Sequence, residues 1–215
     1  MRRHRVIKLV LFDLDGTLIQ STELIMEAFR VTFNAYFKDV DVEPVLTNFL
    51  GQTLAETFGY YLKEDDDLDE IIAFYRKTSE ALIQSEMVAY PNALDIMRYL
   101  KQHRIRIGVV TSKMNNVARQ HLTLVGLSDY VEHLVGYEDV MHHKPDKEPL
   151  EKALTLFQMR SDEAIYIGDH ENDIRSAKAC GMMSCAVSYS HRLKEMLSYM
   201  PDYVIDDLLH IKDIV

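Results

Sequence analysis

Residues 6–17 read VIKLVLFDLDGT, an apolar run that ends in two aspartates, a glycine and a threonine. The four apolar residues from Leu9 to Phe12 are typical of a strand buried on both faces of a parallel sheet. Asp13 and Asp15 follow at once, so we expect them at the carboxyl end of that strand, and Gly16 permits the turn that follows. The stretch predicts an α/β fold with an acidic site at the edge of its sheet.

Apolar, β-branched runs recur along the rest of the chain, and helical patterns separate them. Strands are expected at residues 6–12, 105–110, 164–167, 183–187 and 203–205, with a further short strand within 128–135, and helices at 92–103, 115–125, 147–157 and 173–180. Strands that alternate with helices of this length form right-handed βαβ units with helices on both faces of the sheet. The sequence therefore predicts a Rossmann-like, doubly wound parallel sheet.

Residues 20–85 interrupt this alternation, because they carry helical patterns without a convincing core strand. A helix expected at 22–37 places Ile25, Phe29, Phe33 and Phe37 on one face, which suits packing against another helix. The acidic stretch 64–70 is interpreted as a solvated turn and helix start. We predict a catalytic core of residues 1–19 and 86–215 with an inserted α-helical cap domain of residues 20–85.

The composition bounds the class of protein. Of 215 residues, 47% are hydrophobic and 27% charged, as in a globular protein, and the formal net charge of −10 opposes binding to nucleic acid or an anionic membrane. The first apolar run reaches Asp13 too soon for a secretory signal, and no transmembrane stretch is found. We expect a cytoplasmic monomer or homodimer whose partner is a small molecule, not a nucleic acid or a membrane.

Further polar clusters follow the later strands, where the carboxyl ends of a parallel sheet gather functional groups. Phosphoryl transfer needs a nucleophile, a proton donor for the leaving oxygen, and cations that hold the transferring group. Asp13 and Asp15 offer the first two, and Mg²⁺ prefers carboxylate ligands such as Asp169. Asp173 lies four residues later on the opening helix, where we expect it beside the metal.

The cluster of carboxylates repels a phosphate dianion unless positive donors offset it. Lys144 is a compact point charge suited to phosphate, and Thr111 offers a hydroxyl at the end of the second strand. We expect the backbone amides of Ser112 and Lys113 to add donors near a helix N-terminus.

Taken in order, Asp13-x-Asp15-Gly16-Thr17, Thr111, Lys144-Pro145 and Gly168-Asp169-x-x-x-Asp173 resemble the four motifs of the haloacid dehalogenase superfamily. The resemblance implies a Rossmann-like core with a helical cap inserted after the first motif. It also implies an aspartyl-phosphate on Asp13, with Asp15 as general acid and then base, and a phosphoryl group held by Thr111 and Lys144. The implied Mg²⁺ ligands are the carboxylates of Asp13 and Asp169 and the carbonyl of Asp15.

A narrower resemblance concerns the substrate. Gly51-Gln52-Thr53-Leu54 and residues 144–149 resemble phosphoglycolate phosphatases and, more closely, PpaX-type pyrophosphatases. It implies that Gly51, Gln52 and Thr53 face the substrate, a small phosphorylated metabolite or inorganic diphosphate. A simple turn at Gly51 is the alternative interpretation of this stretch. The run His170-Glu171-Asn172 departs from the commonest fourth motif, which leaves open whether Glu171 or Asp173 contacts the metal.

Two alternatives share the motifs. A phosphomutase of the β-phosphoglucomutase type would return the phosphoryl group to a sugar, but such mutases use a basic residue in the cap loop, and Gly51-Gln52-Thr53 offers none. A non-catalytic metabolite-sensing module on the same fold would not need the acid, base, lysine and metal ligands that this chain retains.

Overall fold

A computed structural model describes residues 6–50 and 52–215 of the chain. The chain divides into two compact units, Met1–Ile19 with Ala89–Val215, and Gln20–Val88. The second boundary lies after Val88 and not after residue 85 as expected. One reason is that the last helix of the smaller unit continues to Glu86. The other is that the amide of Gln20 donates to the carbonyl of Val88 at 2.9 Å, so the first and last residues of the smaller unit are hydrogen-bonded to each other.

The larger unit is built on a parallel sheet. Among the described residues the six strands lie in the order β3-β2-β1-β4-β5-β6, and every neighbouring pair is parallel. Phe12 at the end of β1 lies opposite Val109 of β2 and Ile167 of β4. This confirms the doubly wound α/β fold. The strands are β1 Leu9–Phe12, β2 Arg106–Val110, β3 His133–Val135, β4 Ala164–Gly168, β5 Met183–Val187 and β6 Tyr203–Ile205.

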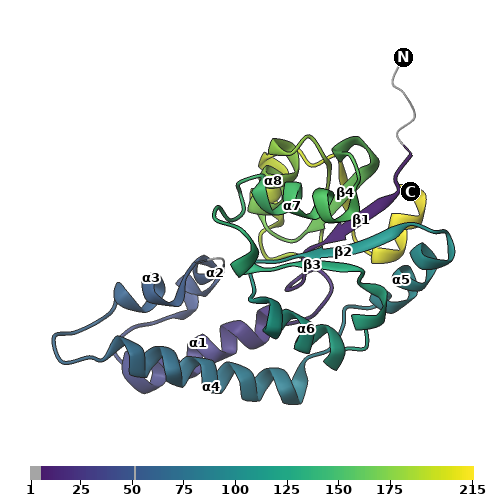
Figure 1. Ribbon diagram of the computed structural model, residues 1–215. Coiled ribbons are helices and arrows are strands. Elements are labelled where there is room, and N and C mark those ends of the chain that lie inside the picture. Colours follow the sequence, from purple (N-terminus) through teal and green to yellow (C-terminus); the bar gives the residue numbers. More distant parts are fainter. Residues whose placement is uncertain (1–5, 51) are drawn as a thin grey trace. The chain divides into compact units, whose positions relative to one another are not determined.

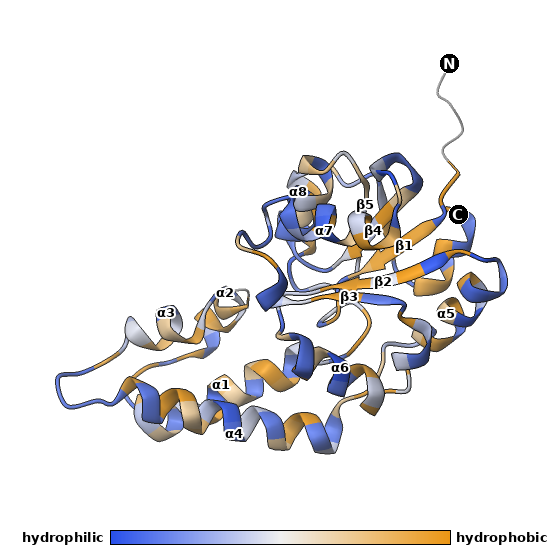
Figure 2. Ribbon diagram, viewed as in Figure 1, coloured by the Kyte–Doolittle hydropathy of each residue, from blue (hydrophilic) through white to orange (hydrophobic). Residues whose placement is uncertain are grey.

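Helices cover both faces of this sheet. Figure 1 shows α5 and α6 on one side and α7 and α8 on the other. Gly126 and Gly181 follow α6 and α8 with φ of 73° and 71°, the left-handed conformation that ends helices at glycine. Figure 2 shows the apolar strands between these helix layers. The helices are α5 Ala93–Gln102, α6 Asn115–Leu124, α7 Glu148–Phe157, α8 Glu171–Ala179 and α9 Leu193–Ser198.

The short strand expected within residues 128–135 is present as β3. Residues 128–135 form a 3-10 turn over Ser128–Tyr130 before β3 begins at His133. The amide of Tyr130 donates to the carbonyl of Leu127 at 3.1 Å, so this backbone bonds locally and leaves the ladder only three residues. The sequence therefore predicted the presence of this strand, and the local turn determines the residue at which it begins.

The smaller unit is helical, as its sequence pattern predicts. Phe29, Phe33 and Phe37 are buried, and the ring of Phe33 lies 5.1 Å from Phe37 and 5.4 Å from Phe49. Asp67 accepts bonds from two amides of the first turn of α4, so the acidic stretch does start a helix. No described helix combines the length and apolar character needed to cross a membrane. The helices are α1 Thr22–Tyr36, α2 Leu46–Phe49, α3 Leu54–Gly59 and α4 Leu68–Glu86.

We expect Phe33→Ala to lower the free energy of unfolding of this unit by about 3–5 kcal/mol, because it removes a ring that is 1% exposed from an aromatic cluster. Hydrogen exchange of the α1 and α4 amides should accelerate, while β1 and β4 keep their protection. Tyr60→Ala, at a side chain that is 85% exposed, is the matched control and should change exchange little. Unchanged exchange in α1 for Phe33→Ala would contradict the prediction.

Candidate active site

The carboxyl ends of β1, β2 and β4 meet at the edge of the sheet, and each delivers a polar residue there. Asp13 follows β1 and its amide donates to the carbonyl of Ile167 at 2.8 Å. Thr111 follows β2, and Asp169 follows β4. Gly16 has φ 75°, so the turn after Asp13 uses the conformation that glycine adopts without strain. The topology thus brings together three residues that lie far apart in the sequence.

Lys144 makes three hydrogen bonds that link the polar residues of this site. Its ammonium donates to Asp13 Oδ1 at 2.8 Å, to Asp173 Oδ1 at 2.7 Å and to the hydroxyl of Tyr166 at 3.0 Å. An ammonium has three N–H donors, so these contacts engage all of them. The Tyr166 hydroxyl in turn donates to the carbonyl of Val110 at 2.7 Å, which leaves its oxygen free to accept from Lys144.

Sequence reasoning missed Tyr166. It lies two residues before Gly168 on β4, and strand alternation places both on one face of the sheet. Its phenol is 1% exposed and its hydroxyl contacts Lys144 and the end of β2. A tyrosine in an otherwise apolar buried strand is the feature that points to it, because a buried phenol needs a polar partner.

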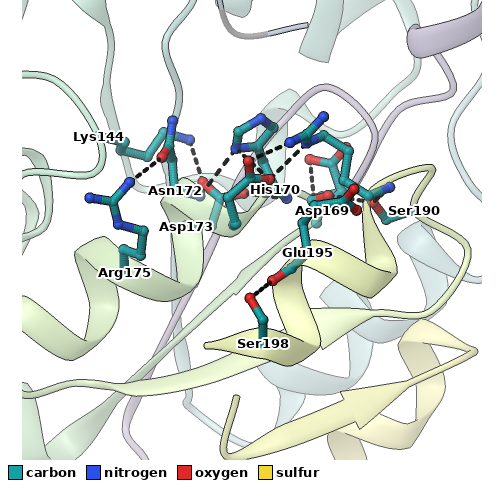
Figure 3. A network of polar contacts seen from close by, with 12 residues as sticks. Lys144, Asp169, His170, Asn172, Asp173, Arg175, Ser190, Glu195 and Ser198 are labelled. Atoms are coloured by element: carbon teal, nitrogen blue, oxygen red, sulfur yellow. Dashed lines mark hydrogen bonds and ion pairs between the residues drawn. The ribbon is translucent and has the colours of Figure 1, made fainter. Parts of the chain in front are cut away.

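Asp173 both begins α8 and holds Lys144. Its Oδ2 accepts from the amide of His170 at 3.0 Å, and His170 Nδ1 accepts from the amide of Asn172 at 3.1 Å, which together form a capping box. Figure 3 shows Lys144, Asp173 and His170 in this network. A Cβ on Gly168 would overlap the Asp173 carboxylate, so the Gly-Asp step is needed for this approach. His170 is therefore a helix cap.

Asp13, Asp169 and Asp173 form a group whose carboxylate oxygens lie within 4.8 Å of one another. Burial raises the pKa of Asp13 to about 7, and the charges of Asp173 and Asp15 add to this while Lys144 opposes it. Burial and the charges of Asp13 and Asp173 also hold the pKa of Asp169 well above its usual range. Buried, mutually repelling oxygens of this kind fit a hard cation such as Mg²⁺.

We expect cation binding to this group to release protons. Below pH 7 the Asp13 carboxyl is increasingly protonated, so a cation must displace the proton, and the Mg²⁺ affinity should fall as pH falls, by about tenfold per pH unit for one proton. Calorimetric titration with Mg²⁺ at pH 8, 7 and 6, in buffers of different ionisation enthalpy, measures both quantities. An affinity that stays constant from pH 8 to 6 would rule the linkage out.

Asp15 binds the side chain of Lys113, with Lys113 Nζ 2.7 Å from Asp15 Oδ1. The Lys113 amide, expected to face phosphate, donates to Thr111 Oγ1 at 3.2 Å. The first amide of α6, on Asn115, donates to the Glu138 carboxylate at 3.0 Å. The expected amide donors are therefore partly engaged within the protein, and it is the Lys113 side chain that reaches the site. Ser112 is exposed.

Glu171 binds Arg192 and does not belong to the group formed by Asp13, Asp169 and Asp173. Its two oxygens accept from Arg192 at 2.5 and 2.7 Å, and Arg192 lies in the loop after β5. In the same loop, Ser190 donates to the carbonyl of Asp169, as Figure 3 also shows, and Tyr189 donates to the carbonyl of Thr17 at 2.9 Å. The sequence left open whether Glu171 or Asp173 contacts the metal. Asp173 belongs to the group of three carboxylates formed with Asp13 and Asp169, whereas Glu171 is paired with Arg192.

Two of the three expected substrate-facing residues of the smaller unit, Gln52 and Thr53, have local contacts. Gly51 lies outside the described residues. Thr53 caps α3, since its hydroxyl and amide contact Glu56 at 2.7 and 3.0 Å. Gln52 is exposed and its Oε1 accepts from the Thr57 hydroxyl at 3.3 Å. A capping box accounts for the Thr53 side chain without a substrate.

Buried and partly buried aspartates, a threonine and a lysine lie together at the carboxyl edge of a doubly wound sheet, and such an arrangement defines an α/β enzyme site. The family model described as haloacid dehalogenase-like hydrolase matches residues 10–187, from β1 through β5. The chain belongs to this family and is a phosphohydrolase.

Individual relatives agree over nearly the whole chain. Pyrophosphatase PpaX of Bacillus cereus strain Q1 is 34% identical over 209 residues, which cover 95% of this chain and 96% of the relative. A haloacid dehalogenase-like family hydrolase from Streptococcus pneumoniae superposes with a TM-score of 0.80 at 25% identity, over 97% of this chain and 98% of that one. A predicted phosphatase from Clostridium acetobutylicum gives 0.78 at 28%, over 97% and 99%.

Proposed function

We propose that this chain is a Mg²⁺-dependent phosphohydrolase that acts through an aspartyl-phosphate on Asp13. The observation that carries the proposal is the Lys144 bridge: a buried lysine holds the Asp13 carboxylate at 2.8 Å while Asp173 and Tyr166 hold the lysine. A carboxylate beside a fixed ammonium is placed to attack an anionic phosphoryl group, because the ammonium offsets the charge between them.

The residues divide the reaction between them. The Asp13 carboxylate attacks phosphorus, the bond from phosphorus to the leaving oxygen breaks, and Asp15 gives that oxygen its proton. Water then attacks the same phosphorus and passes a proton to Asp15, which frees phosphate and restores Asp13. Lys144 moves one of its three N–H donors from Asp13 to a phosphoryl oxygen, and Thr111 offers its hydroxyl.

Asp13 and Asp169, with the carbonyl of Asp15, would hold Mg²⁺, which supplies positive charge to the phosphoryl oxygens. Asp173 keeps both of its oxygens for Lys144 and the His170 amide, so it supports the site from beside the ion. The support for these ligands is that carboxylate oxygens of Asp13, Asp169 and Asp173 lie within 4.8 Å of one another, and that Mg²⁺ prefers such oxygens.

Inorganic diphosphate is the substrate we place first, because pyrophosphatase PpaX of B. cereus is similar over nearly the whole chain. A phosphoglycolate-like ester is the second candidate. The test is release of phosphate from diphosphate, phosphoglycolate and sugar phosphates, with Mg²⁺ and with a chelator. Release that needs Mg²⁺ supports the proposal, and no release from any of them would contradict it.

Water labelled with ¹⁸O separates hydrolysis from the mutase alternative. A hydrolase places the label in released phosphate, whereas a mutase transfers the phosphoryl group to a sugar without it. Turnover of any of these substrates would also rule out the alternative that the chain is a non-catalytic metabolite-sensing module.

A further inference from the structure

Each carboxylate that follows β1 holds its own lysine. Lys144 contacts Asp13 at 2.8 Å, and Lys113 contacts Asp15 at 2.7 Å. The Lys113 side chain is only 17% exposed although it sits in a short loop between β2 and α6. The loop therefore directs this ammonium toward the interior, where it has lost part of its contact with water.

His121, on α6, holds the ammonium of Lys113 from the other side. Its Nδ1 lies 3.1 Å from Lys113 Nζ, and the residue is 5% exposed. An ammonium has no lone pair, so Nδ1 is the acceptor and the ring proton is on Nε2. Burial and then the charge of Lys113 lower the pKa of His121 to about 4, which agrees with a neutral ring. The Lys113 ammonium is thus fixed between an interior acceptor and Asp15.

The two lysines serve different ends of the substrate. Under the proposed function Asp13 attacks phosphorus and Asp15 protonates the leaving oxygen, so Lys144 lies beside the transferring phosphoryl group and Lys113 beside the leaving group. Lys113 Nζ is 2.7 Å from the Asp15 oxygen, so a group that takes its proton from Asp15 comes within reach of the ammonium.

We propose that Lys113 is a specificity-determining residue that selects substrates whose leaving group is anionic, as the phosphate released from diphosphate is. The inference rests on the proposed function. When the bond from phosphorus to the leaving oxygen breaks, its electron pair stays on that oxygen and the Asp15 proton joins it. A leaving group with a further negative charge replaces Asp15 as the acceptor of the ammonium, and a neutral alcohol does not.

Three substrates test this selection. Phosphoglycolate and 2-hydroxyethyl phosphate release similar alcohols that differ in a carboxylate, and diphosphate releases phosphate. We expect Lys113→Met to lower kcat/KM for diphosphate and phosphoglycolate about 10- to 100-fold more than for 2-hydroxyethyl phosphate. Lys113→Arg should keep most of the preference. Lys152→Met, at an exposed lysine of α7, is the charge-matched control and should leave the ratios unchanged.

An equal loss on all three substrates would overturn the inference, because it would mean that Lys113 only positions Asp15. Binding gives a measure that does not need turnover. In calorimetry with Mg²⁺, Lys113→Met should weaken binding of methylenediphosphonate about 10-fold or more relative to methylphosphonate. Unchanged relative binding overturns the inference alone, whereas a wild-type protein inactive on every substrate contradicts the proposed function alone.

Discussion

Asp13→Asn should lower kcat for phosphate release by roughly 10⁴-fold or more, because the amide oxygen is neutral and a poor nucleophile toward phosphorus. The same change should not destabilise the metal-free protein above pH 7. The pKa of Asp13 is about 7 in the folded chain against 3.8 as its ordinary value. A raised carboxyl pKa means that stability is lost as pH rises toward the folded pKa, and asparagine removes that loss.

We therefore expect Asp13→Asn to lose activity without losing stability. Steady-state kinetics with Mg²⁺ and thermal unfolding in a chelator at pH 8 measure the two effects on one preparation. Asp65→Asn, an exposed acid of the smaller unit, should change neither. If Asp13→Asn kept more than about a hundredth of the wild-type kcat, attack by Asp13 would be ruled out.

The fold could be predicted because its information is local. The strand expected at 6–12 is present as β1, which begins only at Leu9 and ends at Phe12 as expected, and each polar cluster follows a strand directly. Parallel topology then brings Asp13, Thr111 and Asp169 to one edge without any further information about distant contacts. The short strand expected within residues 128–135 is present as β3, but its start at His133 depends on the local hydrogen bonds of a turn, which leave no mark in hydrophobic periodicity.

The supporting residues could not be predicted, since their contacts depend on how the side chains point in the folded chain. Tyr166 contacts the end of β2, His121 contacts Lys113 across a turn, and Arg192 binds Glu171 from the loop after β5. None stands in a motif, and each looks like an ordinary buried or surface residue in the sequence. For Lys113 the sequence suggested a role for the amide and did not predict the contact of its side chain with Asp15.

Gly168→Ala should both destabilise the larger unit and disable the site. A Cβ at this position would overlap Asp173, which is 1% exposed and packed among fully buried residues of β4 and α8. Overpacking of this kind typically costs about 1–3 kcal/mol in the free energy of unfolding. Displacing Asp173 also removes one of the three acceptors of Lys144, and a misplaced charge at a reacting centre lowers kcat/KM by roughly 100-fold.

A second substitution separates these two effects. Asp173→Ala removes the group that the new methyl would strike, so Gly168→Ala should cost much less stability in that background than in the wild type, whereas activity should stay low because Lys144 has lost its anchor. Gly59→Ala is the matched control, since a Cβ there meets nothing within 4 Å. Chemical unfolding and kcat/KM for the four combinations measure the coupling. If the activity returned in the double variant, Asp173 would matter only for packing, and the role of Lys144 as a lysine held in place by Asp173 would have to be abandoned.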